Sequence, residues 1–298
     1  MKNLPKIVVI MSTYNGEKFV KEQIDSILAQ KDVDLTLHIF DDCSKDRTVD
    51  FVKEYEKKNK NVFLHINEKN KNFTYNFLDA LFSFKDNQNY DYYAFADQDD
   101  FWLEDKLISA INKIKEKGKC SLYCSNLKIV DENLIYAGNN MMPQNYINKH
   151  YDILCKNIVT GCTVVMDNDF KNLATKFYPE NIYLHDYWLA LIANYCKDAN
   201  FIYDEDPSHI LYRQHGTNLI GSNKNILKKF KKKVLQKSSY NLVKNFYQLY
   251  GNFIIENDLK VFKKASELNK IKNRFLLFFK IKSNFSLEFK IKLLLNNY

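Results

Sequence analysis

The N-terminal part of the chain alternates between short apolar runs and longer amphipathic segments. The run "KIVVIM" (6–11) is continuously apolar, as is typical of a strand covered on both faces. The next segment, "EKFVKEQIDSILAQ", places its apolar residues on one helical face. Further strands are predicted at 34–40, 61–67 and 91–96, with helices between them. This repeat predicts an α/β fold with a mostly parallel sheet and helices on both faces.

After residue 102 the pattern is less regular. Strands are predicted at 121–130 and at 157–166, the second with Gly161 in its middle, where glycine often marks close approach of a ligand. A helix is predicted at 184–196 and a late strand with its loop at 209–218. We therefore expect one domain over 1–222, made of halves 1–102 and 103–222, and a separate helical segment over 223–298.

Polar residues follow each of the first four predicted strands. In α/β sheets ligands bind beyond the carboxyl ends of the strands, so these residues should line one crevice. The fourth strand ends in "DQDD", where Asp97, Asp99 and Asp100 repel each other unless a cation or a shared proton offsets their charge. A metal site is predicted there. The alternative is capping of the helix after "FW", which explains one Asp better than three.

Charge is distributed unevenly along the chain. Residues 223–298 hold 18 Lys or Arg and 4 Asp or Glu, whereas the whole chain has a net charge of +8, so residues 1–222 are net acidic. A basic segment with interleaved apolar residues predicts either a solvated face with dimer contacts or docking to an anionic membrane surface. Nucleic acid is not expected as a partner, because no recognition motif accompanies the charge.

The sequence has no feature of a membrane-spanning or secreted chain. Its apolar runs are far shorter than the roughly 20 residues that a span requires, and the N-terminus has only a five-residue apolar run. The six Cys are scattered without a zinc-site spacing, which favours reduced thiols. We expect a cytoplasmic protein, which would lie at the inner face of the cell membrane if its basic segment binds lipid.

Six segments together resemble the family 2 glycosyltransferases of the GT-A (Rossmann-like nucleotide-diphospho-sugar transferase) fold, in particular the bacterial rhamnosyltransferase-like subgroup. They occur in the order used by that family and cover roughly residues 5 to 220. The segments are "MSTYNGEKFVKEQIDSILAQ", "DDCSKDRTVDFVKEY", "FADQDDFWLEDKL", "IVTGCTVVM", "HDYWLALIA" and "YRQHGTN".

The resemblance implies a metal-dependent inverting glycosyltransferase. It would move a sugar, rhamnose being one candidate, from a UDP- or dTDP-sugar to a hydroxyl of a glycan or lipid-linked acceptor in surface polysaccharide or lipopolysaccharide synthesis. The departing sugar is oxocarbenium-like, and a Mn²⁺ or Mg²⁺ ion held by carboxylates stabilises the diphosphate that leaves. The half 1–102 would bind the nucleotide sugar and the half 103–222 the acceptor.

The resemblance also implies roles for individual residues on the donor side. Asp99 is the expected direct metal ligand, with Asp97 and His215 completing the site. A carboxylate at Asp41 would accept a hydrogen bond from a base N–H, which predicts uracil or thymine; the alternative is that Asp41 and Asp42 form a turn with Ser44. The expected donor-binding residues are Thr13, Tyr14, Glu17, Asp41, Asp42, Asn72, Asp97 and Arg213.

On the acceptor side, Asp186 is the expected catalytic base, which takes the proton of the attacking hydroxyl. Its alternative role, compatible with the first, is a helix N-cap. Gly161, Cys162, His185 and Trp188 are expected to contact the acceptor, although Trp188 also suits core packing.

Two other functions are alternatives to glycosyl transfer. A nucleotidyltransferase would need a Gly-rich or basic phosphate loop after the first strand, and "MSTYNGEKF" is not one. A non-catalytic sugar-nucleotide-binding subunit would bind donor without transferring the sugar.

Overall fold

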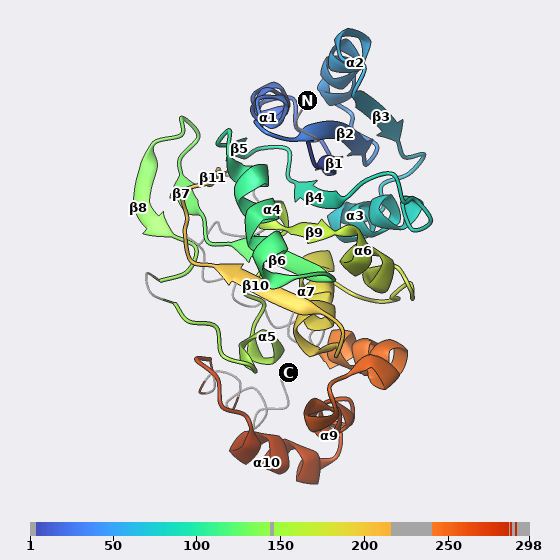
Figure 1. The fold of residues 1–298 in the computed structure, drawn as a ribbon, viewed down its shortest axis with the longest axis vertical. Helices are drawn as coiled ribbons and strands as arrows, with labels where there is room; N and C mark the ends of the chain where they lie inside the picture. Colours follow the sequence, from blue (N-terminus) through green and yellow to red (C-terminus); the bar gives the residue numbers. More distant parts are fainter. Residues whose placement is uncertain (1–3, 144–145, 216–239, 286, 288–289, 291–298) are drawn as a thin grey trace. The chain divides into compact units, whose positions relative to one another are not determined.

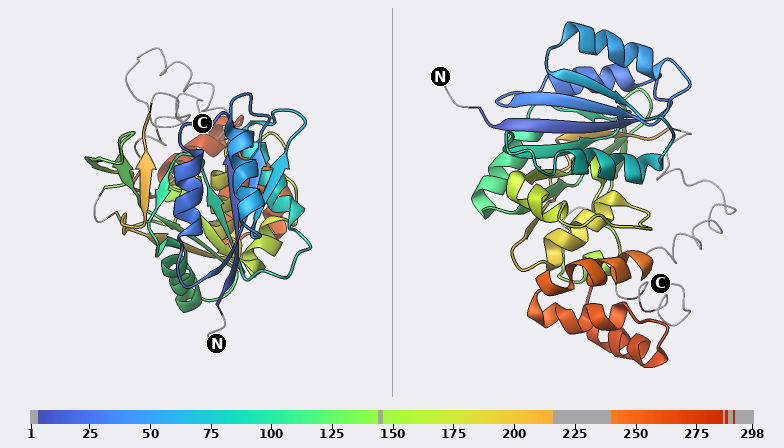
Figure 2. Two further views of the ribbon diagram at one scale, coloured as in Figure 1. Left: turned by 90° about the horizontal axis from the view of Figure 1, so that it is seen from above. Right: turned by 90° about the vertical axis from the view of Figure 1, so that its right-hand side faces the viewer.

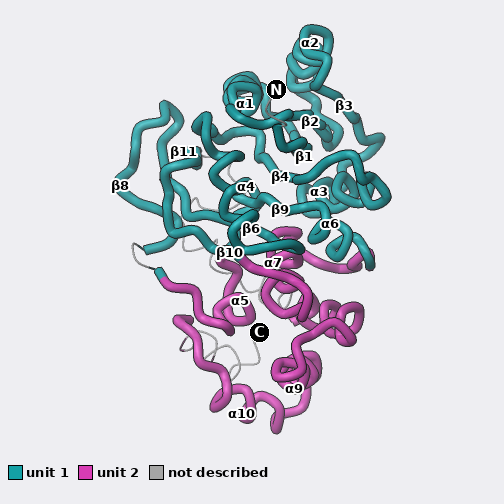
Figure 3. Tube along the Cα trace, in the orientation of Figure 1, with its two compact units in different colours: residues 1–146, 159–176, 202–222 teal, residues 147–158, 177–201, 223–298 magenta. Residues whose placement is uncertain are grey.

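A computed structural model gives the fold of the chain (Figure 1) and describes residues 4–143, 146–215, 240–285, 287 and 290. The chain divides into two compact units (Figure 3), and each is described by itself. Segments 147–158 and 177–201, which the sequence analysis assigns to the half 103–222, belong to unit 2. Unit 1 is Met1–Tyr146, Val159–Lys176 and Ile202–Ser222, and unit 2 is Ile147–Ile158, Phe177–Phe201 and Asn223–Tyr298.

A seven-stranded sheet, with strand order β10-β6-β9-β4-β1-β2-β3, forms the centre of the fold. The prediction of a mostly parallel sheet is confirmed for the first four strands, since β1 pairs in parallel with β2 and β4, and β2 with β3. Strand β9 runs antiparallel to both β4 and β6. The strands are β1 (Lys6–Thr13), β2 (Asp34–Asp41), β3 (Val62–Ile66), β4 (Tyr92–Ala96), β6 (Ser121–Ser125), β9 (Val165–Asp167) and β10 (Asn200–Asp204).

The register of the parallel strands brings their carboxyl ends to one edge of the sheet. Thr13 at the end of β1 pairs with Asp41 at the end of β2, and Asp41 pairs with Ile66 at the end of β3. Met11 pairs with Ala96, the last residue of β4. The strands lie side by side in the right-hand view of Figure 2. The loops after β1, β2 and β4 therefore start close together.

Helices pack on both faces of the sheet. On one face, Ile24 of α1, Val52 of α2 and Ile111 of α4 join a buried apolar cluster with alternate residues of β1, among them Val9. On the other face α3 contacts β1, and Phe77 packs against Phe95 of β4 with ring centroids 5.0 Å apart. These helices of unit 1 are α1 (Val20–Leu28), α2 (Thr48–Lys58), α3 (Asn72–Ser83), α4 (Lys106–Lys117) and α6 (Asn168–Ala174).

A small second sheet, with strand order β5-β11-β7-β8, brings distant segments to the end of β4. Strand β11 pairs antiparallel with β5, which directly follows the "DQDD" segment, and parallel with β7. The end of β11 therefore lies beside the acidic cluster, although more than a hundred residues separate them in the sequence. The strands are β5 (Phe101–Trp102), β7 (Lys128–Val130), β8 (Tyr136–Asn140) and β11 (Ile210–Arg213).

Two of the predicted strands are wrong in extent. The segment 121–130 is split into β6 and β7 because the buried Asn126 turns the chain, with its Oδ1 accepting hydrogen bonds from the backbone N–H of Leu127 and Met142. In the segment 157–166 the strand begins only at Val165, because Gly161–Thr163 form a 3₁₀ turn (η1). The Thr163 N–H and hydroxyl both donate to the Thr160 carbonyl, which closes this turn.

Unit 2 is helical in its described residues. An aromatic core joins Trp188 of α7 to Phe246 and Tyr250, and the buried Asp258 hydrogen-bonds to His150 and Tyr151. Among the described residues, no helix is long and apolar enough to cross a membrane. The elements are α5 (Asp152–Cys155), α7 (His185–Tyr195), a helical stretch at 240–250, η2 (Gly251–Phe253), α9 (Glu256–Ala265) and α10 (Ile271–Lys280).

The side chain of Asn76 in α3 supports the ends of β1 and β2 through hydrogen bonds. Its Nδ2 donates to the Ser12 hydroxyl and the Phe40 carbonyl, and its Oδ1 accepts from Asn67. Because Asn76→Ala removes three hydrogen bonds of a buried side chain, we expect the free energy of unfolding to fall by about 2 kcal/mol. Urea denaturation measures this. The matched Asn112→Ala on the exposed side of α4 should have no destabilising effect, and equal losses in both variants would contradict the role of Asn76.

Candidate functional site

The acidic cluster lies in the loop that follows β4. Asp100 is fully buried; its Oδ1 accepts a hydrogen bond from the Arg213 N–H at 3.3 Å, and its Oδ2 has no hydrogen-bond partner among the described residues. Asp97, Asp100 and Cys162 each place one potential ligand atom within 4.8 Å of the others. Asp99 Oδ2 lies 2.8 Å from His215 Nε2, which brings together two residues predicted as metal ligands.

The acids of this cluster lie close together, and burial removes part of the water around them. Burial, and then the charges of Asp99 and Asp97, raise the pKa of Asp100 well above its usual value. Burial, and then the neighbouring Asp100 and Asp97, also raise the pKa of the Cys162 thiol. The buried Lys106 lies nearby with its Nζ 3.4 Å from the Trp102 ring centroid, and burial lowers its pKa to about 7. The charges of the acids therefore favour a cation beside them, whereas burial opposes the charge of Lys106.

These residues fit a divalent cation with a preference for oxygen ligands. Mg²⁺ and Mn²⁺ bind carboxylates well, and the buried carboxyl of Asp100 lies beside the carboxylate of Asp97, so two oxygen ligands are close together. The Cys162 thiol suits such an ion poorly, because its raised pKa keeps it protonated. The structure thus adds Asp100 to the predicted carboxylates, a residue that the sequence analysis leaves open as a helix cap.

Arg213 holds the acidic loop from the side of β11. Its guanidinium donates to the Asp99 carbonyl at 2.9 Å, to the Glu132 carbonyl and to the Glu22 carboxylate. It lies over the Phe19 ring at 4.5 Å and is almost fully buried. These contacts join the loop to α1 and to the β7–β8 connection, so Arg213 positions Asp99 through the backbone.

Hydrogen bonds from three segments hold the carboxylates of Asp41, which ends β2, and Asp42, which follows it. Both oxygens of the buried Asp41 accept hydrogen bonds, Oδ1 from the Ser44 N–H and Oδ2 from the Thr13 and Ser44 hydroxyls. The Oδ1 of Asp42 accepts from the Asn67 amide and the Lys71 N–H. The predicted turn between Asp41 and Ser44 is therefore present. A hydrogen bond between Asp41 and a nucleobase stays a prediction.

The loop after β1 is fastened to the loop after β2. The Glu17 carboxylate accepts from the Arg47 N–H, and the Glu17 N–H donates to Asp46. Asn15 has a left-handed backbone (φ 49°) and exchanges hydrogen bonds with the Ser44 hydroxyl and the Lys45 N–H. Asn72, predicted to bind donor, begins α3, and its Oδ1 accepts from the Thr74 N–H as a cap.

Gln98, the middle residue of the "DQD" motif, connects the loop after β4, which carries the acidic cluster, to the loop after β1. Its Oε1 accepts from the Tyr14 N–H at 2.8 Å and its Nε2 donates to the Tyr14 carbonyl at 3.1 Å. A Cβ on Gly16 would lie 2.2 Å from Gln98 Oε1, so a side chain at this position would displace the Gln98 amide. Sequence reasoning named Asp100 in the acidic cluster but missed Gln98 and Lys106, and the unbroken run of polar residues at 97–100 is the only signal for Gln98.

The predicted catalytic base lies in unit 2. Asp186 is buried in the first turn of α7, where its Oδ1 accepts from the Asn157 amide at 3.1 Å and the Tyr187 N–H at 2.6 Å. Beside it, burial lowers the pKa of His185 to about 3, which keeps the ring neutral. Trp188 is fully buried against Phe246 and Tyr250, which favours core packing over stacking on a sugar.

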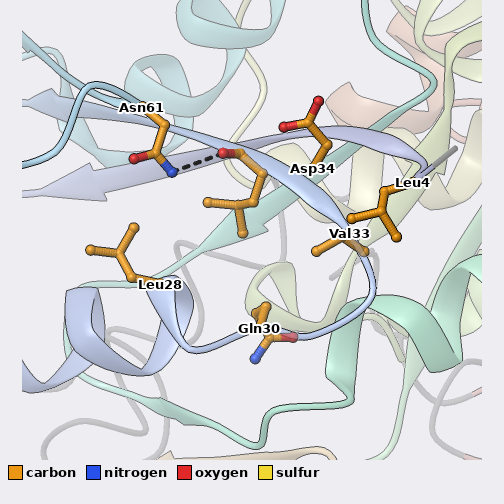
Figure 4. Close-up of a pocket in the computed structure, with 7 residues that line it drawn as sticks. Leu4, Leu28, Gln30, Val33, Asp34 and Asn61 are labelled. Atoms are coloured by element: carbon orange, nitrogen blue, oxygen red, sulfur yellow. Dashed lines mark hydrogen bonds between the residues drawn. The ribbon is translucent and has the colours of Figure 1, made fainter. Parts of the chain in front are cut away.

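A hollow near the amino ends of the first strands has a different character (Figure 4). Leu4, Leu28, Val33 and Asp34 line it, together with Asn61, whose amide donates to the Leu35 carbonyl. Asp34 begins β2 and Asp41 ends it, so the hollow lies at the opposite edge of the sheet from the acidic cluster. It offers one carboxylate, two amide side chains and a few apolar groups, and we assign it no chemistry.

The fold and the cluster define a class of protein: an α/β enzyme with acidic groups at the carboxyl ends of parallel strands. The model of the family described as "Glycosyl transferase family 2" matches residues 8–174, more than half of the chain. The chain belongs to this family and is a glycosyltransferase, which confirms the resemblance in the sequence.

Curated relatives agree with this assignment. The chain is 31% identical over 234 residues to the "dTDP-rhamnosyl transferase RfbG" of Shigella flexneri, covering 74% of this chain and 77% of that protein. It is 31% identical over 203 residues to a "UDP-Glc:alpha-D-GlcNAc-diphosphoundecaprenol beta-1,3-glucosyltransferase WfgD" of Escherichia coli, covering 65% of this chain and 71% of the relative.

Solved structures show the same GT-A fold at low sequence identity. S. aureus TarS 1-349, solved in complex with UDP-GlcNAc, matches with a TM-score of 0.57 and 15% identity over 97% of this chain and 89% of that one. The mannosyltransferase PcManGT from Pyrobaculum calidifontis, solved with GDP-Man and Mn²⁺, matches with a TM-score of 0.55 and 14% identity over 99% of this chain and 75% of that one.

Gly16 and Gln98 should behave as a coupled pair. In the natural chain Gly16→Ala displaces the Gln98 amide, and we expect it to lower the free energy of unfolding by about 2 kcal/mol through two lost hydrogen bonds. In a Gln98→Ala background the same change meets more open space and should cost about 0.5 kcal/mol or less. Urea denaturation of the four proteins measures the coupling energy. Additive losses would contradict the contact between the two loops.

Proposed function

We propose that the chain is a metal-dependent inverting glycosyltransferase that moves a sugar from a UDP- or dTDP-sugar to a hydroxyl of a glycan or lipid-linked acceptor. The process it would serve is the synthesis of a bacterial surface polysaccharide or lipopolysaccharide. The observation that carries the proposal is the grouping of Asp97 and Asp100 at the end of β4, with the neighbouring Asp99 in contact with His215. Family membership supports glycosyl transfer as the chemistry, in place of nucleotidyl transfer.

The names of the relatives support the donor class. RfbG is named for a dTDP-sugar and WfgD for a UDP-sugar, whereas PcManGT was solved with GDP-Man. We favour a uracil or thymine nucleotide because carboxylates stand at the end of β2, where an imide N–H could donate. Rhamnose is a candidate sugar because RfbG aligns over most of both chains.

Asp97, Asp99 and His215 would hold the cation, as the resemblance implies, and Asp100 would add a carboxylate beside Asp97. When bound, Mn²⁺ or Mg²⁺ supplies positive charge to the departing diphosphate. The chain's own part is to keep these carboxylates in place, which Arg213 does through the Asp99 carbonyl and the Asp100 side chain. A direct contact of Arg213 with donor stays a prediction.

The loops after β1 and β2 would bind the nucleoside. Tyr14 is exposed and its backbone is fixed by Gln98, so its ring is free to approach a base or ribose. Thr13, Glu17 and Asp41 are tied to each other's loops, which orients the pocket before donor arrives. Asp42 and Asn72 would border the same pocket.

Asp186 would act as the general base on the acceptor side. Its hydrogen bond from Asn157 fixes the carboxylate, and a carboxylate is suited to take the proton of the attacking hydroxyl. Acceptor contacts of Gly161 and Cys162 in unit 1, and of the neutral His185 in unit 2, stay predictions from the resemblance. Trp188 would support His185 from the core through α7.

Asp99→Asn tests the metal site. The substitution removes one negative charge while keeping the shape, so we expect thermal protection by UDP or dTDP with Mn²⁺ to be lost or weakened at least about tenfold. Differential scanning fluorimetry with and without EDTA measures it. The exposed Asp86→Asn serves as the matched control. Protection that persists in Asp99→Asn, or that EDTA leaves unchanged in the natural chain, would contradict the assignment.

Asp186→Asn separates transfer from binding. Loss of a general base should slow sugar transfer by about 10²–10⁴-fold, while donor binding stays unchanged. Transfer assays over a panel of UDP- and dTDP-sugars with acceptor extracts, together with calorimetric donor binding, measure both quantities. The exposed Asp198→Asn is the control in the same unit. Transfer at the natural rate in Asp186→Asn would exclude it as the base, and a chain that binds donor but never transfers would support a binding subunit.

A further inference from the structure

Helix α10 (Ile271–Lys280) turns large apolar side chains to solvent. Ile271 is 65% exposed, Phe275 54%, Leu276 39% and Phe279 76%, whereas Leu277 is fully buried. Residues 271, 275 and 279 are each one turn apart, so they lie on one face of the helix. A surface helix normally turns its apolar face inward, and a contiguous exposed patch of this kind marks an interaction site.

Lysines surround this apolar face and acids are missing from it. Residues 271–287 contain three Lys and one Arg and no Asp or Glu. Lys272, Lys280 and Lys282 are exposed, and Lys290 lies over the Phe278 ring at 5.1 Å. The preceding acid, Glu267, is bonded to Lys270 at 2.7 Å. The patch therefore combines apolar area with positive charge.

We propose that this face of α10 docks in the plane of an anionic lipid bilayer. The α10 surface is defined by Ile271, Phe275, Leu276 and Phe279 with Lys272, Lys280 and Lys282. Its aromatic and aliphatic side chains enter the headgroup boundary, and its lysines reach the lipid phosphates. A second copy of the chain fits less well, because a symmetric contact would bring identical lysines together without an acid to pair them.

The expected binding is weak, reversible and sensitive to salt. The helix has ten residues, so only a few apolar side chains insert, and part of the attraction is electrostatic. Each lysine near an anionic surface strengthens binding about fivefold. The proposal concerns unit 2 alone and does not depend on the proposed reaction.

The test is cosedimentation of the full chain with phosphatidylcholine vesicles and with vesicles containing roughly one-third phosphatidylglycerol. We expect binding to the anionic vesicles only. The double variant Phe275→Ser, Phe279→Ser should weaken it at least about tenfold, and the triple variant Lys272→Gln, Lys280→Gln, Lys282→Gln about 100-fold. Matched controls in unit 1 are Ile135→Ser, which removes an exposed apolar group, and Lys57→Gln, Lys58→Gln, Lys60→Gln, which removes equal charge.

Three results would overturn the proposal. One is no vesicle binding, or equal binding to neutral and anionic vesicles. Another is that the controls lose as much binding as the α10 variants. The third is concentration-dependent self-association of the natural chain, abolished in Phe275→Ser, Phe279→Ser without a change in vesicle binding, which would assign the surface to a second copy. Protection by UDP or dTDP with Mn²⁺ is measured on the same variants, so failure of the α10 surface is distinguishable from failure of the proposed function.

Discussion

The crowding of three carboxylates at the end of a buried strand is the constraint on which the rest of the site depends. Asp100 is fully buried and adjacent to Asp99, and burial, followed by the charges of Asp99 and Asp97, raises its pKa. Such crowding is relieved by a proton or by a cation. The positive and polar groups gathered around the cluster, Arg213, Lys106 and His215, relieve it in part and hold its geometry.

Hydrogen bonds between neighbouring loops support the residues around the cluster. Gln98 fastens the acidic loop to the loop after β1, Asn15 and Glu17 fasten that loop to the one after β2, and Asn76 supports the strand ends from α3. These contacts use backbone groups, so they fix the path of the chain and leave the exposed Tyr14 ring available. A site assembled in this way needs little rearrangement when a ligand binds.

Much of the fold could be predicted from the sequence because buried parallel strands read as apolar runs. The strands at 6–11, 34–40, 61–67 and 91–96 were found in this way, and the register of a parallel sheet then brings their ends together. The 3₁₀ turn at Gly161–Thr163 was missed, since apolar residues flank it as in a strand. The division into two units was not predicted, because it depends on contacts that 147–158 and 177–201 make with segments distant in the chain.

The candidate site was predicted less completely than the fold. The acidic motif and His215 came from sequence and resemblance, and the structure places Asp99 and His215 in contact. The burial of Asp100, its neighbour Cys162 and the contact of Gln98 with Gly16 depend on contacts between segments distant in the chain. The hydrophobic periodicity of a single sequence does not indicate which distant residues come into contact.

The most direct test is anomalous diffraction from crystals soaked with Mn²⁺ and a uridine or thymidine diphosphate. The account predicts a manganese peak beside the carboxylates of Asp97, Asp99 and Asp100, in contact with the diphosphate oxygens. A nucleotide that binds at the ends of β1 and β2 with no manganese at those side chains, or manganese bound only elsewhere, would contradict it.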